Sequence, residues 1–188
     1  MGWTSYHATN YTRRGEVDRK AECDSVFTED GEYGKWEVLK SSMCGSTYYA
    51  AVKRTMPSGK TYVFGAVCLT TVDSKDYFNF SYKDMSEDMG PGDCKCPVSI
   101  LDLLSPTENE YALEWRRRCR ENAKGKNSLG RLPVGSVIEF KKRDGSIVRL
   151  VKRSPAYQFK TPWWQIVGEN HYFKKNHIPA EYSVISAA

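Results

Sequence analysis

The sequence predicts an α+β protein, in which an antiparallel sheet meander is packed by a C-terminal helix and followed by a small SH3-like or OB-like β-barrel. Three observations predict this class. Apolar and aromatic residues recur with period two over residues 36–85, apolar residues recur at helical spacing over residues 106–124, and short β-rich runs return after residue 130. A chain of 188 residues accommodates one ordinary domain together with such a small module.

The first strands are expected to form a meander of at least three strands. Both faces of the run TYYAAV, residues 47–52, are apolar, so we expect this strand to be central. The turn sequence MPSGK at residues 56–60 leads into the β-branched and aromatic run at residues 61–72, which is a hairpin signal. The run YFNFSYKDM at residues 77–85 alternates aromatic and polar side chains, which predicts a strand with one buried and one solvated face.

Two helices are expected to follow the meander. Pro97 suits the first turn of a short helix that runs to Leu104. The sequence SPTE at residues 105–108 then combines an N-cap serine, a proline at the first helical position and a glutamate at the third, which is a capping box. We expect the longer helix that this box opens to pack the face of Trp115 on the sheet.

The chain is expected to divide after this longer helix. Glycine, asparagine and serine cluster immediately behind it, which is typical of a linker. Beyond the cluster, two β-rich runs are joined through Asp144 and Gly145, a pair of residues favoured in tight hairpins, and two or three short strands follow. The predicted organisation is a sheet-and-helix domain at residues 1–125, a linker at residues 126–130 and the barrel at residues 131–188.

Charge is distributed unevenly along the chain, whose net charge is +5. Residues 1–104 contain 12 Lys and Arg against 15 Asp and Glu, whereas residues 105–188 contain 16 against 8, so the net charges are −3 and +8. Such asymmetry favours a surface that contacts phosphate groups or an acidic protein, with a solvated lysine-rich surface as the alternative.

Two basic clusters are the candidate binding site for a partner or a nucleic acid. One lies at the end of the predicted helix, where consecutive arginines splay around the axis and cannot all face one ligand. The other lies on the barrel hairpin, where alternate cations share a face near aromatic residues, the mixture with which small barrels bind single strands. The aromatic residues are alternatively part of the barrel core. The candidate residues are Arg116, Arg117, Arg120, Lys141, Arg143, Arg149, Lys152, Arg153, Tyr157, Trp163, Lys174 and Lys175.

An acidic loop precedes the short helix. Asp84, Glu87 and Asp88 lie in it, but their spacing is not that of a calcium-binding EF-hand loop. The loop is therefore expected either to be a solvated turn or to dock a basic partner.

Neither a metal site nor a catalytic site is predicted. Cys94 and Cys96 are separated by one residue, which is less usual in zinc sites than two, and no second pair accompanies them. His7, Cys44 and Asp84 are the residue types of a base, a nucleophile and an orienting carboxylate, but no motif brings them together. We predict no cofactor and no catalysis, with a cysteine- or histidine-dependent enzyme as the alternative.

The protein is expected to remain in the cytoplasm. The N-terminus has no apolar signal region, and no stretch approaches the roughly 18 apolar residues of a membrane span. The six cysteines are then expected to be reduced thiols.

Several blocks of the sequence resemble a poorly characterised domain family found on phages and other mobile elements of gut bacteria. The blocks are MGWTSYHA, DRKAECD, GSTYYAAVKR, FNFSYKDM, MGP, ILDLLSPTENEYALEWR and LPVGSVIEF. The resemblance spans almost the whole chain, and none of its blocks is a catalytic signature. We associate proteins of this kind with anti-CRISPR inhibitors that act on Cas9-type nucleases.

The resemblance implies a counter-defence protein that binds and blocks a Cas9-type nuclease complex in the host bacterial cell without catalysis. A net charge of +5 does not suit an acidic mimic of DNA. A basic inhibitor would instead contact an acidic face of the nuclease, its guide RNA, or DNA beside the enzyme. The alternative is a nucleic-acid-binding accessory protein.

Overall fold

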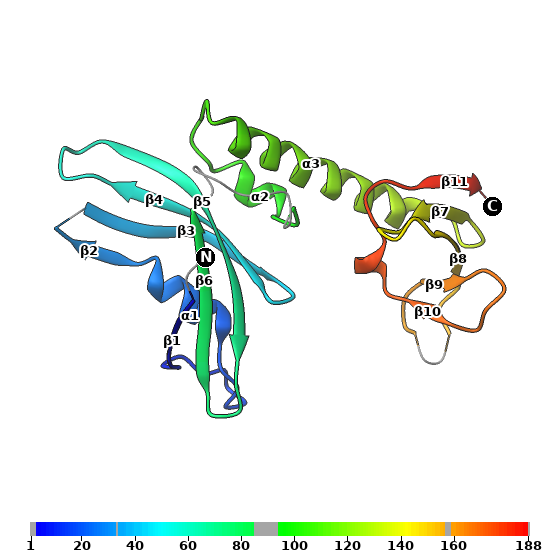
Figure 1. Cartoon of the computed structure of the whole chain (residues 1–188), viewed down its shortest axis with the longest axis horizontal. Helices are drawn as coiled ribbons and strands as arrows, with labels where there is room; N and C mark the ends of the chain where they lie inside the picture. The colour runs from blue at the N-terminus through cyan, green and yellow to red at the C-terminus, as the bar shows by residue number, and fades with distance from the viewer. Residues whose placement is uncertain (1–2, 33, 85–93, 157–158, 188) are drawn as a thin grey trace. The chain divides into compact units, whose positions relative to one another are not determined.

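Two antiparallel sheets form the framework, one in each of two units, Met1–Arg120 and Glu121–Ala188 (Figure 1). The computed structural model describes residues 3–32, 34–84, 94–156 and 159–187. The first unit contains β1 (Thr4–His7), α1 (Arg19–Val26), β2 (Glu29–Gly31), β3 (Gly34–Cys44), β4 (Thr47–Thr55), β5 (Thr61–Val72), β6 (Tyr77–Asp84) and α2 (Val98–Leu101). Helix α3 (Glu110–Arg131) runs from the first unit into the second, which contains β7 (Val137–Lys141), β8 (Ile147–Arg153), β9 (Trp163–Ile166), β10 (Tyr172–Phe173), the 3-10 helix η1 (Lys175–His177) and β11 (Ser183–Ser186). The predicted α+β class is confirmed.

The six-stranded sheet has the order β1-β6-β5-β4-β3-β2 and curls, so the predicted meander is confirmed for β3 to β6. Strand β4 lies between β3 and β5, and both faces are covered: Tyr48 and Tyr49, which point to opposite faces, are each 0% exposed. The predicted central strand is therefore confirmed, and its apolar residues form the centre of two separate cores.

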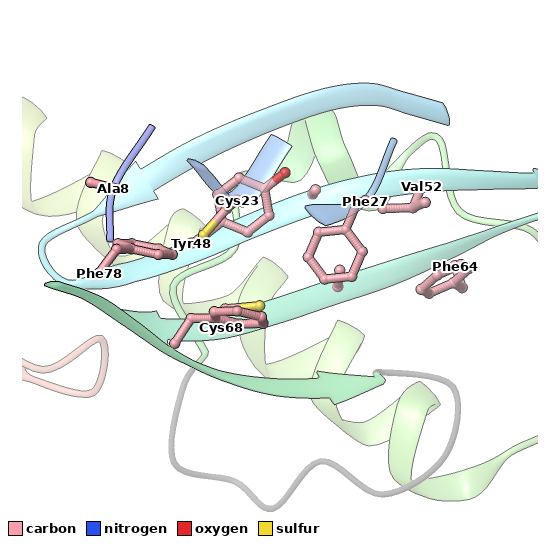
Figure 2. Packing of buried hydrophobic residues seen from close by; sticks show 11 residues of the cluster. Ala8, Cys23, Phe27, Tyr48, Val52, Phe64, Cys68 and Phe78 are labelled. Carbon is pink, nitrogen blue, oxygen red and sulfur yellow. The ribbon is translucent and has the colours of Figure 1, made fainter. Parts of the chain in front are cut away.

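Helix α1 covers one face of this sheet. Cys23 of the helix and Phe27, the residue that follows it, pack against Tyr48, Cys68 and Phe78 of the strands, and Phe27 stacks on Tyr48 with ring centroids 6.0 Å apart (Figure 2). The start of the helix is fixed by Asp18, whose carboxylate accepts a hydrogen bond from the backbone N–H of Ala21.

A buried carboxylate ties the N-terminal segment to α1. Glu22 is 1% exposed and accepts hydrogen bonds from the backbone N–H groups of Thr9 and Asn10 and from the hydroxyl of Tyr6. Burial raises the pKa of Glu22, but these hydrogen bonds outweigh it, so the pKa lies below its ordinary value. The ionised carboxylate is therefore a structural part of the fold.

Helices α2 and α3 cover the opposite face of the sheet. Ile100 of α2 and Trp115 of α3 are 1% and 2% exposed and pack with Tyr49 and Val67 of the strands. The predicted packing of the Trp115 face is confirmed. The predicted short helix is present as α2, although it ends at Leu101.

The predicted capping box at residues 105–108 is wrong. Ser105 pairs with β5 instead: its hydroxyl accepts the backbone N–H of Val63 at 2.8 Å, and its own N–H donates to the carbonyl of Val63 at 2.9 Å. Helix α3 begins at Glu110, where the side-chain oxygen of Asn109 accepts the N–H of Ala112 at 3.1 Å. Asn109 is therefore the N-cap, because a sheet contact occupies Ser105.

We expect the substitution Asn109→Ala to lower the free energy of unfolding by about 1 kcal/mol, because the N–H of Ala112 loses its acceptor. Glu108→Ala is the matched control. It should have an effect within about 0.5 kcal/mol, because Glu108 lies outside the observed cap. Urea unfolding of both variants measures the difference. A larger loss of stability in Glu108→Ala would contradict Asn109 as the N-cap and support the predicted capping box.

The predicted linker at residues 126–130 is also wrong, since these residues are helical and belong to α3. Gly125 is there for packing: a Cβ built on it would lie 2.6 Å from the carbonyl oxygen of Ala180. Tyr182 donates a hydrogen bond to the carbonyl of Gly125 at 3.2 Å, and Leu129 is 1% exposed in the core of the second unit. The small residues thus allow another segment to approach the helix closely.

The second sheet has the order β10-β9-β8-β7-β11. The predicted hairpin through Asp144 and Gly145 is confirmed between β7 and β8, where Gly145 has a φ of 88° and Asp144 accepts hydrogen bonds from Ser146. Ile138, Leu150 and Trp164 form the centre of its core. Although this unit is small, every strand except β11 contributes apolar side chains to its core.

Candidate nucleic-acid interface

Strand alternation divides the residues of β8 between two sides of the second sheet. Val148, Leu150 and Lys152 are buried and point toward the core, whereas Arg149 and Arg153 are exposed on the opposite side. Because successive side chains of a strand point to opposite faces, these two arginines share one side.

Strand register extends this side to the neighbouring strands. Arg153 pairs with Trp163 of β9, and Gln165 of β9 pairs with Tyr172 of β10. Paired residues of an antiparallel sheet project to the same face, so both aromatic residues lie on the side of Arg153. Lys141, the last residue of β7, is exposed on the same side. We call this surface the outer face and define it by Lys141, Arg149, Arg153, Trp163 and Tyr172.

Three aromatic rings meet at one end of the outer face. The ring of Phe159 lies 4.9 Å from that of Trp163 and 4.9 Å from that of Tyr172, at interplanar angles of 26° and 24°. Tyr172 is 47% exposed, and Phe159 and Trp163 are half-buried. We call these three residues the aromatic cluster. Its exposed ring surface is available for stacking against a planar group.

The cations of the outer face differ in how far their charge is neutralised. The Nε of Arg149 lies 2.6 Å from a carboxylate oxygen of Glu139, which compensates its charge. The Nε of Arg153 donates at 2.7 Å to the side-chain oxygen of Gln165, a neutral group, so this contact leaves the positive charge beside Trp163 uncompensated. The second unit as a whole has 12 Lys and Arg against 5 Asp and Glu.

This arrangement combines the two elements that hold a nucleic-acid strand. Aromatic rings stack on bases, and positive charges contact the phosphates beside them. Of the residues predicted for this site, the structure brings together Lys141, Arg149, Arg153 and Trp163 on one face. Tyr172 was missed, because only the register of β9 with β10 shows that it lies beside Trp163.

Lys152 lies away from the outer face. It is 7% exposed, and its ammonium group donates hydrogen bonds to the carbonyls of Gly130 at 3.0 Å and Leu132 at 2.6 Å, at the C-terminal end of α3. Burial, followed by the charge of Lys175, lowers the pKa of Lys152. Lys152 thus caps the helix, where a cation also complements the helix dipole.

We expect Lys152→Met to lower the free energy of unfolding by about 1–2 kcal/mol, since the carbonyl of Gly130 in the last turn of α3 and that of Leu132 just after the helix lose a charged donor. The neighbouring Arg153→Met is the matched control and should change stability by less than about 0.5 kcal/mol. Thermal or urea unfolding of both variants measures this contrast. Equal stability of the two variants would show that the contacts of Lys152 do not hold the helix end.

The predicted helix arginines are held by partners within the first unit. Arg116 donates to the carbonyl of Ser105 at 2.9 Å, and Arg120 lies 2.8 Å from Asp102. Arg117 forms a bidentate ion pair with Glu114. The hydrogen bonds from Arg117, and secondly the one from Arg118, lower the pKa of Glu114 to about 2. The charges of Arg117 and Arg120 are thereby compensated locally, and these arginines do not belong to the outer face.

The remaining predicted cations lie at the margins of the second sheet. Arg143 is exposed in the hairpin between β7 and β8, and Lys174 is exposed after β10. Lys175 begins η1 and lines a pocket. Tyr157 lies outside the described residues, as do Glu87, Asp88 and the side chain of Asp84 from the acidic loop.

The cysteines occupy both cores of the first unit. Cys96 and Cys119 are buried in the core beneath α2 and α3, with Cys44 and Cys94 packed against it. Burial, together with the two neighbouring thiols Cys119 and Cys44, raises the pKa of Cys96. In the described ranges, no group of three or more His, Cys, Asp or Glu side chains could hold a metal ion.

His7 and Cys44 lie far apart in the sheet. His7 is on β1 and its ring contacts that of Tyr77 at an angle of 37°, with ring centroids 3.9 Å apart, whereas Cys44 ends β3. Three strands separate β1 from β3, and each strand spacing is about 4.8 Å. A base and a nucleophile must approach to within about 3 Å, and the described backbone does not bring this pair together.

Comparison with known proteins adds one match. A family model described as a domain of unknown function (DUF6927) matches residues 106–153, which include α3 and the hairpin of β7 and β8. No curated protein and no solved structure matches the chain. None of the helices in the described part of the chain combines the length and the hydrophobicity that spanning a membrane requires.

Proposed function

We propose that this protein is a non-catalytic counter-defence protein that engages a Cas9-type nuclease complex by contacting its nucleic acid through the outer face. The observation that carries the proposal is the pairing of Arg153 with Trp163 beside the exposed ring of Tyr172. The resemblance to proteins of phages and mobile elements supports the choice of target. The separation of His7 from Cys44 supports binding rather than catalysis.

As part of this proposal, the second unit is a small barrel of the SH3-like kind. Strands β7 to β10 follow one another as neighbours, and after η1 the last strand, β11, returns to pair with β7. A four-strand meander whose following strand returns to pair with the first, after a 3-10 turn, supports this choice, because SH3-like barrels have this strand order and OB-folds do not. Barrels of such size bind ligands on exposed strands and loops.

Binding to nucleic acid is tested first, with a fluorescently labelled single strand and a duplex of the same sequence. Because charge on the outer face is expected to neutralise phosphates, affinity should fall steeply as salt rises, and Arg153→Gln should reduce the slope by about one. Binding without a salt slope would contradict a role for the outer face in holding nucleic acid.

Inhibition is tested separately, by measuring cleavage by several Cas9-type nucleases with and without the purified protein. The proposal predicts reduced cleavage, and it predicts that the double variant Arg153→Gln, Trp163→Ala restores cleavage. Unchanged cleavage with every nuclease would rule out the counter-defence function. If nucleic-acid binding persisted in that case, the protein would be a nucleic-acid-binding accessory protein.

A further inference from the structure

A pocket of about 280 Å³ lies in the second unit, and its lining divides into a cationic and an apolar part. Two lysines contribute the charge, whereas a buried tryptophan, a proline and a leucine contribute the apolar wall. The lining residues used here are Leu129, Lys152, Thr161, Pro162, Trp164 and Lys175. The pocket is distinct from the outer face, because Lys152 and Trp164 point to the core side of their strands.

The two lysines converge on the same end of α3. The ammonium group of Lys152 donates to the carbonyls of Gly130 and Leu132, which uses two of its three N–H bonds. The Nζ of Lys175 lies 3.5 Å from the position that a Cβ on Gly130 would occupy. Within the part of the chain that the structure describes, neither lysine has a carboxylate in ion-pair distance.

The charge at this end of the pocket is incompletely balanced. A helix C-terminus supplies about half a negative charge, so two ammonium groups leave an excess of about one and a half positive charges. Burial is the main cause of the lowered pKa of Lys152, and the charge of Lys175 lowers it further, as expected for two neighbouring cations. An anion placed between the two groups would relieve this repulsion.

We propose that this pocket binds a phosphate monoester, with the phosphate between Lys152 and Lys175 and the body of the ligand against Trp164 and Pro162. A phosphate monoester carries up to two negative charges near neutral pH, which matches the excess. Its oxygens accept hydrogen bonds from ammonium groups and from a hydroxyl such as that of Thr161. The volume lies just below the usual range for small-molecule pockets, about 300–1,000 Å³, which suits a ligand no larger than one nucleotide.

The pocket is tested by titrating the full chain with adenosine 5′-monophosphate, with adenosine and with inorganic phosphate, using calorimetry. We expect adenosine to bind at least tenfold more weakly than its monophosphate. Lys175→Ala should weaken binding of the monophosphate at least tenfold, and so should Thr161→Val, which leaves both lysines in place. Lys174→Ala is the matched control, because Lys174 is exposed and does not line the pocket.

Three results would overturn the proposal. The first is equal affinity for adenosine and its monophosphate, and the second is no binding of the monophosphate at millimolar concentration by the folded chain. The third is a Lys175→Ala variant that binds the monophosphate as tightly as the Lys174→Ala control does.

The source of the phosphate is distinguished with two oligonucleotides of one sequence, one with a 5′-phosphate and one with a 5′-hydroxyl. If the ligand is a strand end, the phosphorylated strand binds more tightly and Lys175→Ala removes the difference. If the ligand is a free nucleotide, both strands bind equally while the monophosphate still binds the pocket. Trp163→Ala should leave monophosphate binding unchanged. A negative result for strand binding at the outer face can therefore be distinguished from a negative result for monophosphate binding in the pocket.

Discussion

Replacing Trp163 by alanine is expected to weaken the binding of a single-stranded oligonucleotide by about 5-fold to 150-fold, since loss of one base-stacking ring costs about 1–3 kcal/mol. The ring lies at the meeting point of the aromatic cluster and of the charge of Arg153. Its removal takes away a stacking surface and one of the two rings against which Phe159 stacks. Fluorescence anisotropy at fixed salt measures the change.

Two companion variants separate stacking from a general loss of structure. Trp163→Phe retains an aromatic ring and should recover most of the affinity. Trp3→Ala removes an exposed tryptophan of the first unit, 53% exposed, and should leave binding unchanged. Equal losses in Trp3→Ala and Trp163→Ala would contradict the assignment of binding to the outer face.

The second large effect concerns stability. We expect Glu22→Gln to lower the free energy of unfolding at pH 7 by about 2–4 kcal/mol, because hydrogen bonds to a charged group contribute about 1.5–3 kcal/mol and a buried donor left unpaired costs about 1–3 kcal/mol. The donors at risk are the N–H groups of Thr9 and Asn10 and the hydroxyl of Tyr6. Urea unfolding followed by circular dichroism measures this loss.

The effect of Glu22 is also expected to depend on pH. Because its pKa in the folded protein lies below the ordinary value, the stabilisation is complete above about pH 5 and is lost as the pH falls through the folded pKa. The difference between wild type and Glu22→Gln should therefore shrink on acidification. Glu16→Gln, at an exposed position, is the control and should change stability by less than about 0.5 kcal/mol at either pH. A difference that widens in acid would contradict an ionised Glu22.

The periodicity of apolar residues in the sequence correctly predicted the strands and the helix that bury one or both of their faces. Tyr48 and Tyr49 follow one another in the chain and are both fully buried, which requires a strand covered on both faces. Trp115 was likewise placed correctly on the sheet. Local signals at the ends of elements were less informative, because the hydroxyl of Ser105 pairs with a strand 42 residues away instead of capping the helix.

Part of the candidate site was also predicted from the periodicity of the sequence. Alternation along one strand places Arg149 and Arg153 together without knowledge of the fold. The same alternation puts Lys152 on the opposite side, where its burial depends on the end of α3 and could not be read from the hairpin alone. The contact of Trp163 with Tyr172 depends on the register between β9 and β10, which a two-residue strand hardly specifies in the sequence.

The most direct test of the outer face is a nuclear magnetic resonance titration of the full chain with a short single strand. We predict that the indole N–H signal of Trp163 and the backbone amide signals of Arg153 and Tyr172 shift as the strand is added. The indole signals of Trp3 and Trp36 in the first unit should stay in place. Shifts confined to the first unit, or an unchanged Trp163 signal at saturating strand, would contradict the outer face as the nucleic-acid interface.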